Sequence, residues 1–261
     1  HAFNLADQLT QLGHKVWVLT LDSKRSIRQD GKVQVLTGIG HLPIAEVISY
    51  PALGSTNAIS RFLKAKQIDV VSTHTRFFPM SFVGARAAQK AHVTYIHTEH
   101  GSNFVNNSNP IIAIGSRVVD LSLGRYVITH AAQVLGVSEA AANFAGYLGA
   151  KDPQVLYNAI NLPETSYAGP QRPNHLVFIG RMVEGKGWET YLRCLDQLRD
   201  AGQQVTGQML GDGAQLQAAR DLAAKLKLDD VVDIPGRVSP AQVRQAIAGA
   251  TLVNPTVLSE G

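Results

Sequence analysis

The chain has little of what defines several classes of protein. Its 261 residues contain one cysteine, Cys194, which excludes an intramolecular disulfide and indicates a reducing compartment. Cys194 falls at helical spacing with Tyr191, Leu195 and Leu198, so we predict that it lies in a core. No apolar run approaches the roughly 18 residues of a membrane span. No segment has the pattern of a signal peptide.

Charged residues are also few, at 17% of the chain, and their balance is mildly basic, with a formal net charge of +4 and a pI of about 9.2. This balance suits anionic ligands or peripheral contact with an anionic membrane surface, and it equally suits an ordinary basic protein. No block of like charges and no basic stripe with aromatic residues indicates nucleic acid as a partner. With 45% hydrophobic residues, we expect a soluble, cytoplasmic protein of two domains.

Helical and apolar patterns alternate along most of the chain. The first helix is amphipathic, with Gly13 as its C-cap and an apolar face of Ala2, Leu5, Ala6, Leu9 and Leu12. Further helices are predicted over residues 54–66, 79–90, 115–130, 138–149, 187–200, 214–226 and 240–248. Strands are predicted over residues 15–21, 68–73, 92–97, 132–137, 175–180, 204–210, 231–234 and 251–253. This alternation predicts an α/β protein with parallel sheets covered on both faces.

A stretch rich in proline and polar residues interrupts the alternation. We interpret residues 161–174 as a linker between two domains, residues 1–160 and 175–261. Because the first residue is His1 and the last segment ends in a loop, we expect the first domain to be incomplete at its start and the second at its end. Two such domains facing each other would form a ligand cleft between the carboxyl ends of their strands.

A glycine-spaced basic loop follows the apolar strand at 175–180. It leads into the next helix and reads Gly180-Arg181-Met182-Val183-Glu184-Gly185-Lys186-Gly187. Arg181 and Lys186 are two fixed cations, and the start of a helix adds free backbone N–H groups. The loop therefore predicts a site for a diphosphate.

The same loop admits a second interpretation. From Gly180 to Lys186 it matches the glycine spacing of a P-loop, and Asp233-Ile-Pro-Gly236 resembles the acidic loop of GTPases. Gly187, however, stands where a P-loop has the Ser or Thr whose hydroxyl binds magnesium, and no Asn-Lys-x-Asp guanine signature follows. We therefore keep a P-loop-like nucleotide hydrolase as the weaker alternative.

Several segments occur in the same order as in a known family. Gly180-Arg181 at a strand end, followed by Lys186-Gly187 at a helix start, resembles the donor-phosphate signature of glycosyltransferase family 4, in the retaining GT-B class. The other similar segments are Asn4-Leu5-Ala6 with Gly13-His14-Lys15-Val16, His97-Thr98-Glu99-His100-Gly101, Val137-Ser138-Glu139, Tyr157-Asn158-Ala159-Ile160, Leu210-Gly211-Asp212-Gly213, and Pro255 to Glu260-Gly261. The resemblance spans nearly the whole chain, although the family's glycine-rich loop before the first helix and its second glutamate are not in this sequence.

The resemblance implies a GT-B fold of two facing Rossmann-like domains, with the acceptor on residues 1–160 and the nucleotide sugar on residues 175–261. It implies retaining transfer of a sugar from a nucleotide diphosphate sugar to an acceptor hydroxyl, in the synthesis of a bacterial glycan, lipopolysaccharide or glycolipid. The donor is a co-substrate, and no cofactor or metal is implied. A glycan, a lipid-linked molecule and a small molecule all remain open as acceptors. A non-catalytic sugar-nucleotide-binding fragment is the other alternative.

The resemblance also assigns a donor site. Its residues are Gly180, Arg181, Lys186, Gly211, Asp212, Gly213 and Glu260. Arg181 and Lys186 are suited to catalysis because they would bind the leaving diphosphate more tightly as its charge develops. Glu260 would hydrogen-bond the sugar hydroxyls or steady the leaving group, and from its local sequence it is as well explained as a loop carboxylate. Gly211 to Gly213 would bring bare N–H groups to a ribose or phosphate, or form a plain turn.

On the acceptor side, the candidates are His74, His97 and His100, which follow or end predicted strands. His97 and His100 belong to the segment that resembles the family, whereas His74 is placed by its strand alone and is equally well explained as a surface residue. His100 matches the catalytic-site histidine that positions the transferred sugar or the acceptor. His97 is equally well explained as a hydrogen-bonded core residue. A zinc site of His97, Glu99 and His100 is a weak alternative, because the spacing of a helical zinc motif is absent.

Overall fold

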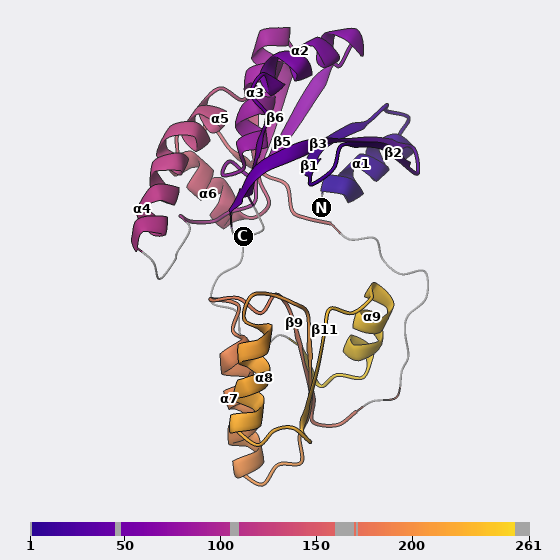
Figure 1. Cartoon of the computed structure of the whole chain (residues 1–261), viewed down its shortest axis with the longest axis vertical. Helices are drawn as coiled ribbons and strands as arrows, with labels where there is room; N and C mark the ends of the chain where they lie inside the picture. The colour runs from indigo at the N-terminus through magenta and orange to yellow at the C-terminus, as the bar shows by residue number, and fades with distance from the viewer. Residues whose placement is uncertain (1, 45–47, 105–109, 160–169, 171, 254–261) are drawn as a thin grey trace. The chain divides into compact units, whose positions relative to one another are not determined.

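The computed structural model describes residues 2–44, 48–104, 110–159, 170 and 172–253. The chain divides into two units, residues 1–161 and 162–260 (Figure 1). Most of the predicted linker, residues 161–174, and all of the segment that contains Glu260 lie outside the described residues. Within them, no helix combines the length and the apolarity that a membrane crossing needs.

The first unit begins with helix α1 (Ala2–Gln11) and a mixed sheet. Its strands are β1 (Trp17–Asp22), β2 (Ser26–Asp30), β3 (Val33–Ile44) and β4 (Ile48–Pro51). β3 runs parallel to β1 and antiparallel to β2 and β4. Only β1 was predicted, and the expectation of purely parallel sheets is wrong for this sheet. Every residue of β2 is exposed, so its sequence lacks the apolar alternation that marks a half-buried strand.

Helix α1 is confirmed, but its predicted apolar face is only partly buried. Ala6 packs with Val33 and Val35 of β3, whereas Leu12 is 76% exposed. The buried residues of the helix are Ala6 and Thr10. Thr10 can be buried because its hydroxyl donates a hydrogen bond to the backbone carbonyl of Asp7. Thr10, which was not part of the predicted apolar face, is therefore buried, whereas Leu5 and Leu12 of that face are exposed.

A second, fully parallel sheet completes the first unit. Its strands lie in the order β5 (Val70–His74), β6 (Thr94–Glu99), β7 (Gln133–Gly136) and β8 (Gln154–Val155). The helices α2 (Ser55–Ala65), α3 (Pro79–Ala91) and α6 (Glu139–Tyr147) confirm three predicted helices. Ser138 caps α6 by accepting the N–H of Ala141, as N-cap serines do. Because β5 and β6 run parallel, their carboxyl ends lie at the same edge of the sheet.

The single helix predicted at 115–130 is instead three segments. α4 (Pro110–Val119) starts five residues earlier, a π-helical segment η1 (Asp120–Gly124) follows, and α5 (Arg125–Thr129) ends the run. The wider turn is defined by the N–H of Arg125, which donates to the carbonyl of Asp120. The widening occurs where Gly124 lies against Arg76: a Cβ on Gly124 would be 3.3 Å from Arg76 Cγ.

The second unit confirms the predicted alternation. Its parallel sheet has the order β11 (Val232–Gly236), β10 (Thr206–Leu210), β9 (His175–Ile179) and β12 (Leu252–Val253). Helices α7 (Trp188–Asp200) and α8 (Leu216–Lys225) cover one face, and α9 (Pro240–Ala248) covers the other (Figure 1). The main core joins Phe178 to Tyr191 and Leu195 of α7. Cys194 of α7 is only half-buried, so its predicted core position is not met.

Candidate functional site

The basic loop connects β9 to α7. Gly187 is the N-cap of α7, with a left-handed φ of 78°. The N–H of Val183 donates to the carbonyl of Arg181 (3.0 Å), and the N–H of Lys186 donates to the carbonyl of Val183 (3.3 Å), so two consecutive tight turns connect Arg181 to Lys186. The first backbone N–H groups of α7, from Trp188 on, precede any acceptor within the helix. The loop thus joins two cations to the positive end of a helix dipole.

The two cations differ in their surroundings. Arg181 is exposed, and its guanidinium has no hydrogen bond or ion pair with any residue that the structure describes. Lys186 is half-buried. An arginine that presents all its donors to solvent can chelate two oxygens of a phosphate at once, whereas a lysine acts as a compact point charge. The arrangement can therefore bind an anion with two acidic groups.

The loop between β10 and α8 is hydrogen-bonded to this basic loop. The N–H of Gly180 donates to the carbonyl of Leu210 (3.0 Å), and the N–H of Met182 donates to the carbonyl of Asp212 (3.0 Å). In return, the carbonyl of Met182 accepts the N–H of Gln215 (2.9 Å). These bonds fix the backbone on both sides of Arg181.

Gly211 and Gly213 make that contact possible. A Cβ on Gly213 would lie 2.5 Å from the carbonyl oxygen of Met182, and the φ values of the two glycines are +140° and +155°. Their amides are already bonded, since the N–H of Gly211 donates to the carbonyl of Gly236 and that of Gly213 to the side chain of Asp212. These N–H groups were predicted to be bare, but both have acceptors within the protein. The loop between β10 and α8 therefore holds the backbone of the basic loop in place rather than offering N–H groups to a ligand.

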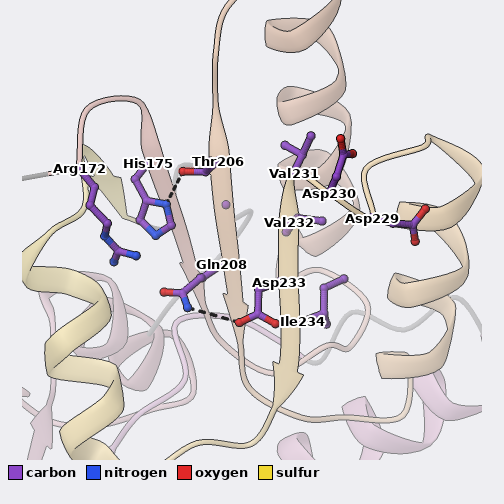
Figure 2. Close-up of a pocket in the computed structure, with 11 residues that line it drawn as sticks. Arg172, His175, Thr206, Gln208, Asp229, Asp230, Val231, Val232, Asp233 and Ile234 are labelled. Atoms are coloured by element: carbon purple, nitrogen blue, oxygen red, sulfur yellow. Dashed lines mark hydrogen bonds between the residues drawn. The ribbon is translucent and has the colours of Figure 1, made fainter.

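A polar hollow of about 440 Å³ lies elsewhere on the second unit (Figure 2). Its lining comes from the amino-terminal halves of the strands, where His175 Nδ1 lies 2.7 Å from Thr206 Oγ1. Gln208 Nε2 donates to Asp233 Oδ2 at 3.4 Å across the same surface. None of the predicted site residues lines this hollow. The basic loop stands at the opposite, carboxyl ends of the strands, where parallel sheets bind their ligands.

In the first unit, His74 and His100 meet at the carboxyl ends of β5 and β6. His74 Nδ1 lies 3.2 Å from His100 Nε2, and Ser72 Oγ lies 3.2 Å from His74 Nε2. Burial, together with the neighbouring His100, lowers the pKa of His74 to about 4, and burial also lowers the pKa of His100. Both rings are therefore neutral at pH 7, and one donates its N–H to the other.

His97 does not join this pair. It is fully buried, with Nδ1 2.9 Å from Thr73 Oγ1 and Nε2 3.4 Å from Glu99 Oε2. The structure places it as a hydrogen-bonded core residue, the alternative left open by the sequence. Among the described residues, no group of three or more His, Cys, Asp and Glu side chains is arranged to hold a metal ion.

A buried ion-pair network behind the histidines went unnoticed in the sequence. Arg76 is 3% exposed, and its guanidinium lies 2.9 Å from both Glu99 Oε1 and Asp120 Oδ2. Burial alone would raise the pKa of Glu99, but the hydrogen bond from His97 and the charge of Arg76 lower it. Burial raises the pKa of Asp120 in spite of Arg76. A detectable signal existed for Asp120, which stands between Val119 and Leu121 in an apolar stretch where a core side chain is expected. Glu99, between Thr98 and His100, carries no such signal.

Comparison with solved structures identifies the class to which this fold belongs. Anabaena HepE, in a crystal structure with UDP and glucose, is 15% identical; the match covers 91% of this chain and 73% of HepE, with a TM-score of 0.64. Sucrose-phosphate synthase from Thermosynechococcus elongatus is 14% identical; the match covers 96% of this chain and 67% of that one, with a TM-score of 0.67. The chain has the GT-B fold, as predicted.

Two family models match the sequence of this chain and together cover its whole length. The model of Glycosyltransferase Family 4 matches residues 1–164, and that of Glycosyl transferases group 1 matches residues 165–261. The chain belongs to glycosyltransferase family 4, which confirms the resemblance drawn from its motifs. An uncharacterised glycosyltransferase of Methanocaldococcus jannaschii is 26% identical over an alignment of 184 residues, and the match covers 65% of this chain and 46% of that protein. The chain thus spans about half the length of this curated relative.

Proposed function

We propose that the protein transfers a sugar, with retention, from a nucleotide diphosphate sugar to an acceptor hydroxyl. Residues 162–260 bind the donor, and residues 1–161 carry the acceptor side. The observation that carries the proposal is the basic loop between β9 and α7, in which Arg181 is exposed without a side-chain partner among the described residues and Lys186 directly precedes the N-cap of α7. Membership of glycosyltransferase family 4 supports the same assignment.

The chemistry requires stabilisation of a leaving group. Transfer breaks the bond between the anomeric carbon and the diphosphate oxygen, and negative charge develops on the diphosphate. Groups that bind this charge more tightly in the transition state than in the ground state lower the barrier. Arg181, Lys186 and the N–H groups at the start of α7 supply positive charge without a metal ion. The proposal therefore includes metal independence.

The remaining roles follow from the same assignment. Gly180, Gly211 and Gly213 shape the loops around the diphosphate, and Asp212 caps the second loop through the N–H of Gly213. Glu260 would hydrogen-bond the donor sugar.

On the acceptor side, His100, held by His74, positions the transferred sugar or the acceptor. Its ring is neutral at pH 7, so it can act as a hydrogen-bond donor or acceptor toward a hydroxyl without presenting a charge. A lipid-linked glycan is the acceptor class that we favour, with peripheral contact at the cytoplasmic face of a membrane. The support is α4, at the rim of the first unit (Figure 1), where Ile111, Ile112 and Ile114 are 79%, 51% and 65% exposed.

Calorimetric titration of this chain tests the donor site. UDP is the first probe, because HepE was crystallised with UDP, and GDP and ADP follow, each with magnesium and with EDTA. We expect one diphosphate to bind equally well in EDTA, and Arg181→Ala or Lys186→Ala to weaken it by roughly 10- to 100-fold. Lys225→Ala removes an exposed lysine from the last turn of α8 and should leave the affinity unchanged.

The other outcomes separate the alternatives. Magnesium-dependent binding of a triphosphate would overturn the proposal and restore the P-loop interpretation. Binding without turnover of any nucleotide sugar, in the protein that contains this chain, would favour a non-catalytic sugar-nucleotide binder. Equal loss of binding in Lys225→Ala would show that net charge, rather than the loop, attracts the nucleotide.

A further inference from the structure

The loop that follows β6 carries His100, and its backbone is hydrogen-bonded to the buried carboxylate of Glu99. We propose that Glu99 is a positioning residue: it fixes the backbone of His100, and Arg76 and Asp120 keep its carboxylate in place. The inference rests on the proposed function, because it assigns a purpose to the placement of His100. It concerns how the acceptor side is built, and it gives Glu99, Arg76 and Asp120 a role that the family resemblance did not assign.

The carboxylate of Glu99 is saturated with donors. Oε1 accepts the backbone N–H groups of His100 (2.9 Å) and Gly101 (2.7 Å). Oε2 accepts the backbone N–H of Arg76 at 3.3 Å, and His97 Nε2 lies 3.4 Å from it. Glu99 has no exposed surface, so none of these bonds competes with water. The first two residues of the loop are therefore fixed by the last residue of the strand.

Arg76 binds the same loop at a second point. Its Nη1 donates to Glu99 Oε1 (2.9 Å), and its Nη2 donates to the carbonyl of Asn103 (3.1 Å). The loop passes so close that a Cβ on Gly101 would lie 2.9 Å from Arg76 Nη1. Arg76 thus bridges both ends of the segment 99–103, and His100 lies between the two anchored points.

The guanidinium is itself held from the opposite side. Arg76 Nη2 donates to Asp120 Oδ2 at 2.9 Å, and the guanidinium carbon lies 4.5 Å from the centre of the Phe144 ring. Asp120 opens the π-helical segment η1, which brings its carboxylate to Arg76. Asp120 has no hydrogen bond to the loop itself. Glu99 and Asp120 therefore share one cation, but only Glu99 contacts the backbone of His100.

This difference provides a matched pair of variants. Glu99→Gln keeps the shape of the side chain and leaves Arg76 neutralised by Asp120, and His97 can change its tautomer to accept from the new amide. Asp120→Asn removes the other carboxylate while keeping an oxygen for Arg76. The glutamine oxygen can still accept the N–H groups of His100 and Gly101, but these two bonds lose the negative charge that strengthens them. In hydrogen exchange on the ligand-free chain, we therefore expect Glu99→Gln to lose roughly 10- to 100-fold of the protection of these two amides. Asp120→Asn should retain it.

Two further readouts distinguish positioning from general support. The groups facing the His100 ring are His74, His97 and Glu99, and the charge of Glu99 raises the pKa of His100. In an NMR titration, the pKa of His100 should therefore fall in Glu99→Gln and stay unchanged in Asp120→Asn. Turnover by the protein that contains the chain should fall in Glu99→Gln, with the KM for the donor unchanged, because the basic loop is intact.

Several outcomes would overturn the inference. Retained amide protection in Glu99→Gln, or equal loss in both variants, would reduce the network to structural support. Loss of UDP binding in Glu99→Gln alone would contradict a local role. Should Glu99→Gln fail to fold, Gly101→Ala displaces the loop while leaving every charge in place, and unchanged His100 protection there would also refute the role. If the wild-type chain binds no nucleotide, the proposed function fails, while the exchange measurement still decides the role of Glu99.

Discussion

Gly211 lies against Gly180 so closely that a Cβ atom on Gly211 would be 1.9 Å from the carbonyl oxygen of Gly180. That carbonyl belongs to the backbone that leads into Arg181, and neither chain segment can withdraw without breaking the hydrogen bonds between their loops. The fold of the second unit and the geometry of its basic loop therefore depend on one contact between two residues without side chains.

The first prediction concerns this contact. Gly211→Ala should lower the free energy of unfolding of the second unit by more than about 3 kcal/mol, since it adds a backbone clash to an unfavourable φ. In a Trp17→Phe background, Trp188 fluorescence during urea unfolding reports this unit. Gly202→Ala is the control, with a φ of +77° but no atom within 4 Å of the new Cβ. It should cost about 1 kcal/mol. Equal losses in the two variants would show that φ strain alone explains the effect.

The second prediction follows from the lowered pKa of His74. Its folded-state pKa is about 4 against 6.5 unfolded, so between these values the unfolded chain binds a proton that the folded chain rejects. Stability is thus fully present above pH 6.5 and falls progressively down to about pH 4. Each pKa unit corresponds to about 1.4 kcal/mol, reduced by solvent screening of this partly exposed ring.

Between pH 7 and pH 4 the free energy of unfolding should fall in both proteins, and the fall should be about 2 kcal/mol smaller in His74→Gln than in the wild type. Trp17 fluorescence in a Trp188→Phe background measures the first unit by urea unfolding at each pH. His14→Gln, which replaces an exposed histidine beyond α1, is the control. A wild-type profile for His74→Gln would assign the acid sensitivity to other groups.

The third prediction concerns α4. Its exposed isoleucines, followed by Arg117 in the last turn, should bind vesicles of phosphatidylcholine with 30% phosphatidylglycerol, a composition that serves only as an anionic test surface. Replacing both Ile111 and Ile114 with aspartate should reduce sedimentation with these vesicles at least tenfold, since each charged side chain must leave water to insert.

Leu12→Asp changes a residue of similar exposure, 76%, on α1, and should bind as the wild type does. Binding that is unaffected by the α4 double substitution but abolished by 0.5 M salt would point to a purely electrostatic attraction. The lipid-linked acceptor would then lose its support.

Elements that depend on local pattern were predictable from the sequence. The run from β9 to α7 combines an apolar strand, glycines and a helical stripe within 26 residues, and both elements formed as expected. The mixed sheet was not predictable in this way. β2 buries no residue and is stabilised by pairing with β3, so its order comes from backbone hydrogen bonds that leave no mark on hydrophobic periodicity.

The residues of the candidate site also differ in whether the local sequence could place them. Arg181 and Lys186 could be placed together because one short loop carries both. The network of Arg76, Glu99 and Asp120 joins residues separated by 23 and 44 positions, and no local spacing relates them. Only the fold brings these charges together, and Asp120 is also the first residue of η1, the segment that interrupts the predicted continuous helix.

The bonded pair of loops around Arg181 also has a thermodynamic consequence for binding. A backbone that is ordered before a ligand arrives has little conformational entropy left to lose on association. The main freedom remaining is that of the exposed Arg181 side chain, worth about 0.5–1.5 kcal/mol when it is immobilised. The diphosphate should therefore bind to a surface whose backbone is already ordered. The entropy change of binding should come from the immobilised Arg181 side chain and from released water, rather than from the ordering of a loop.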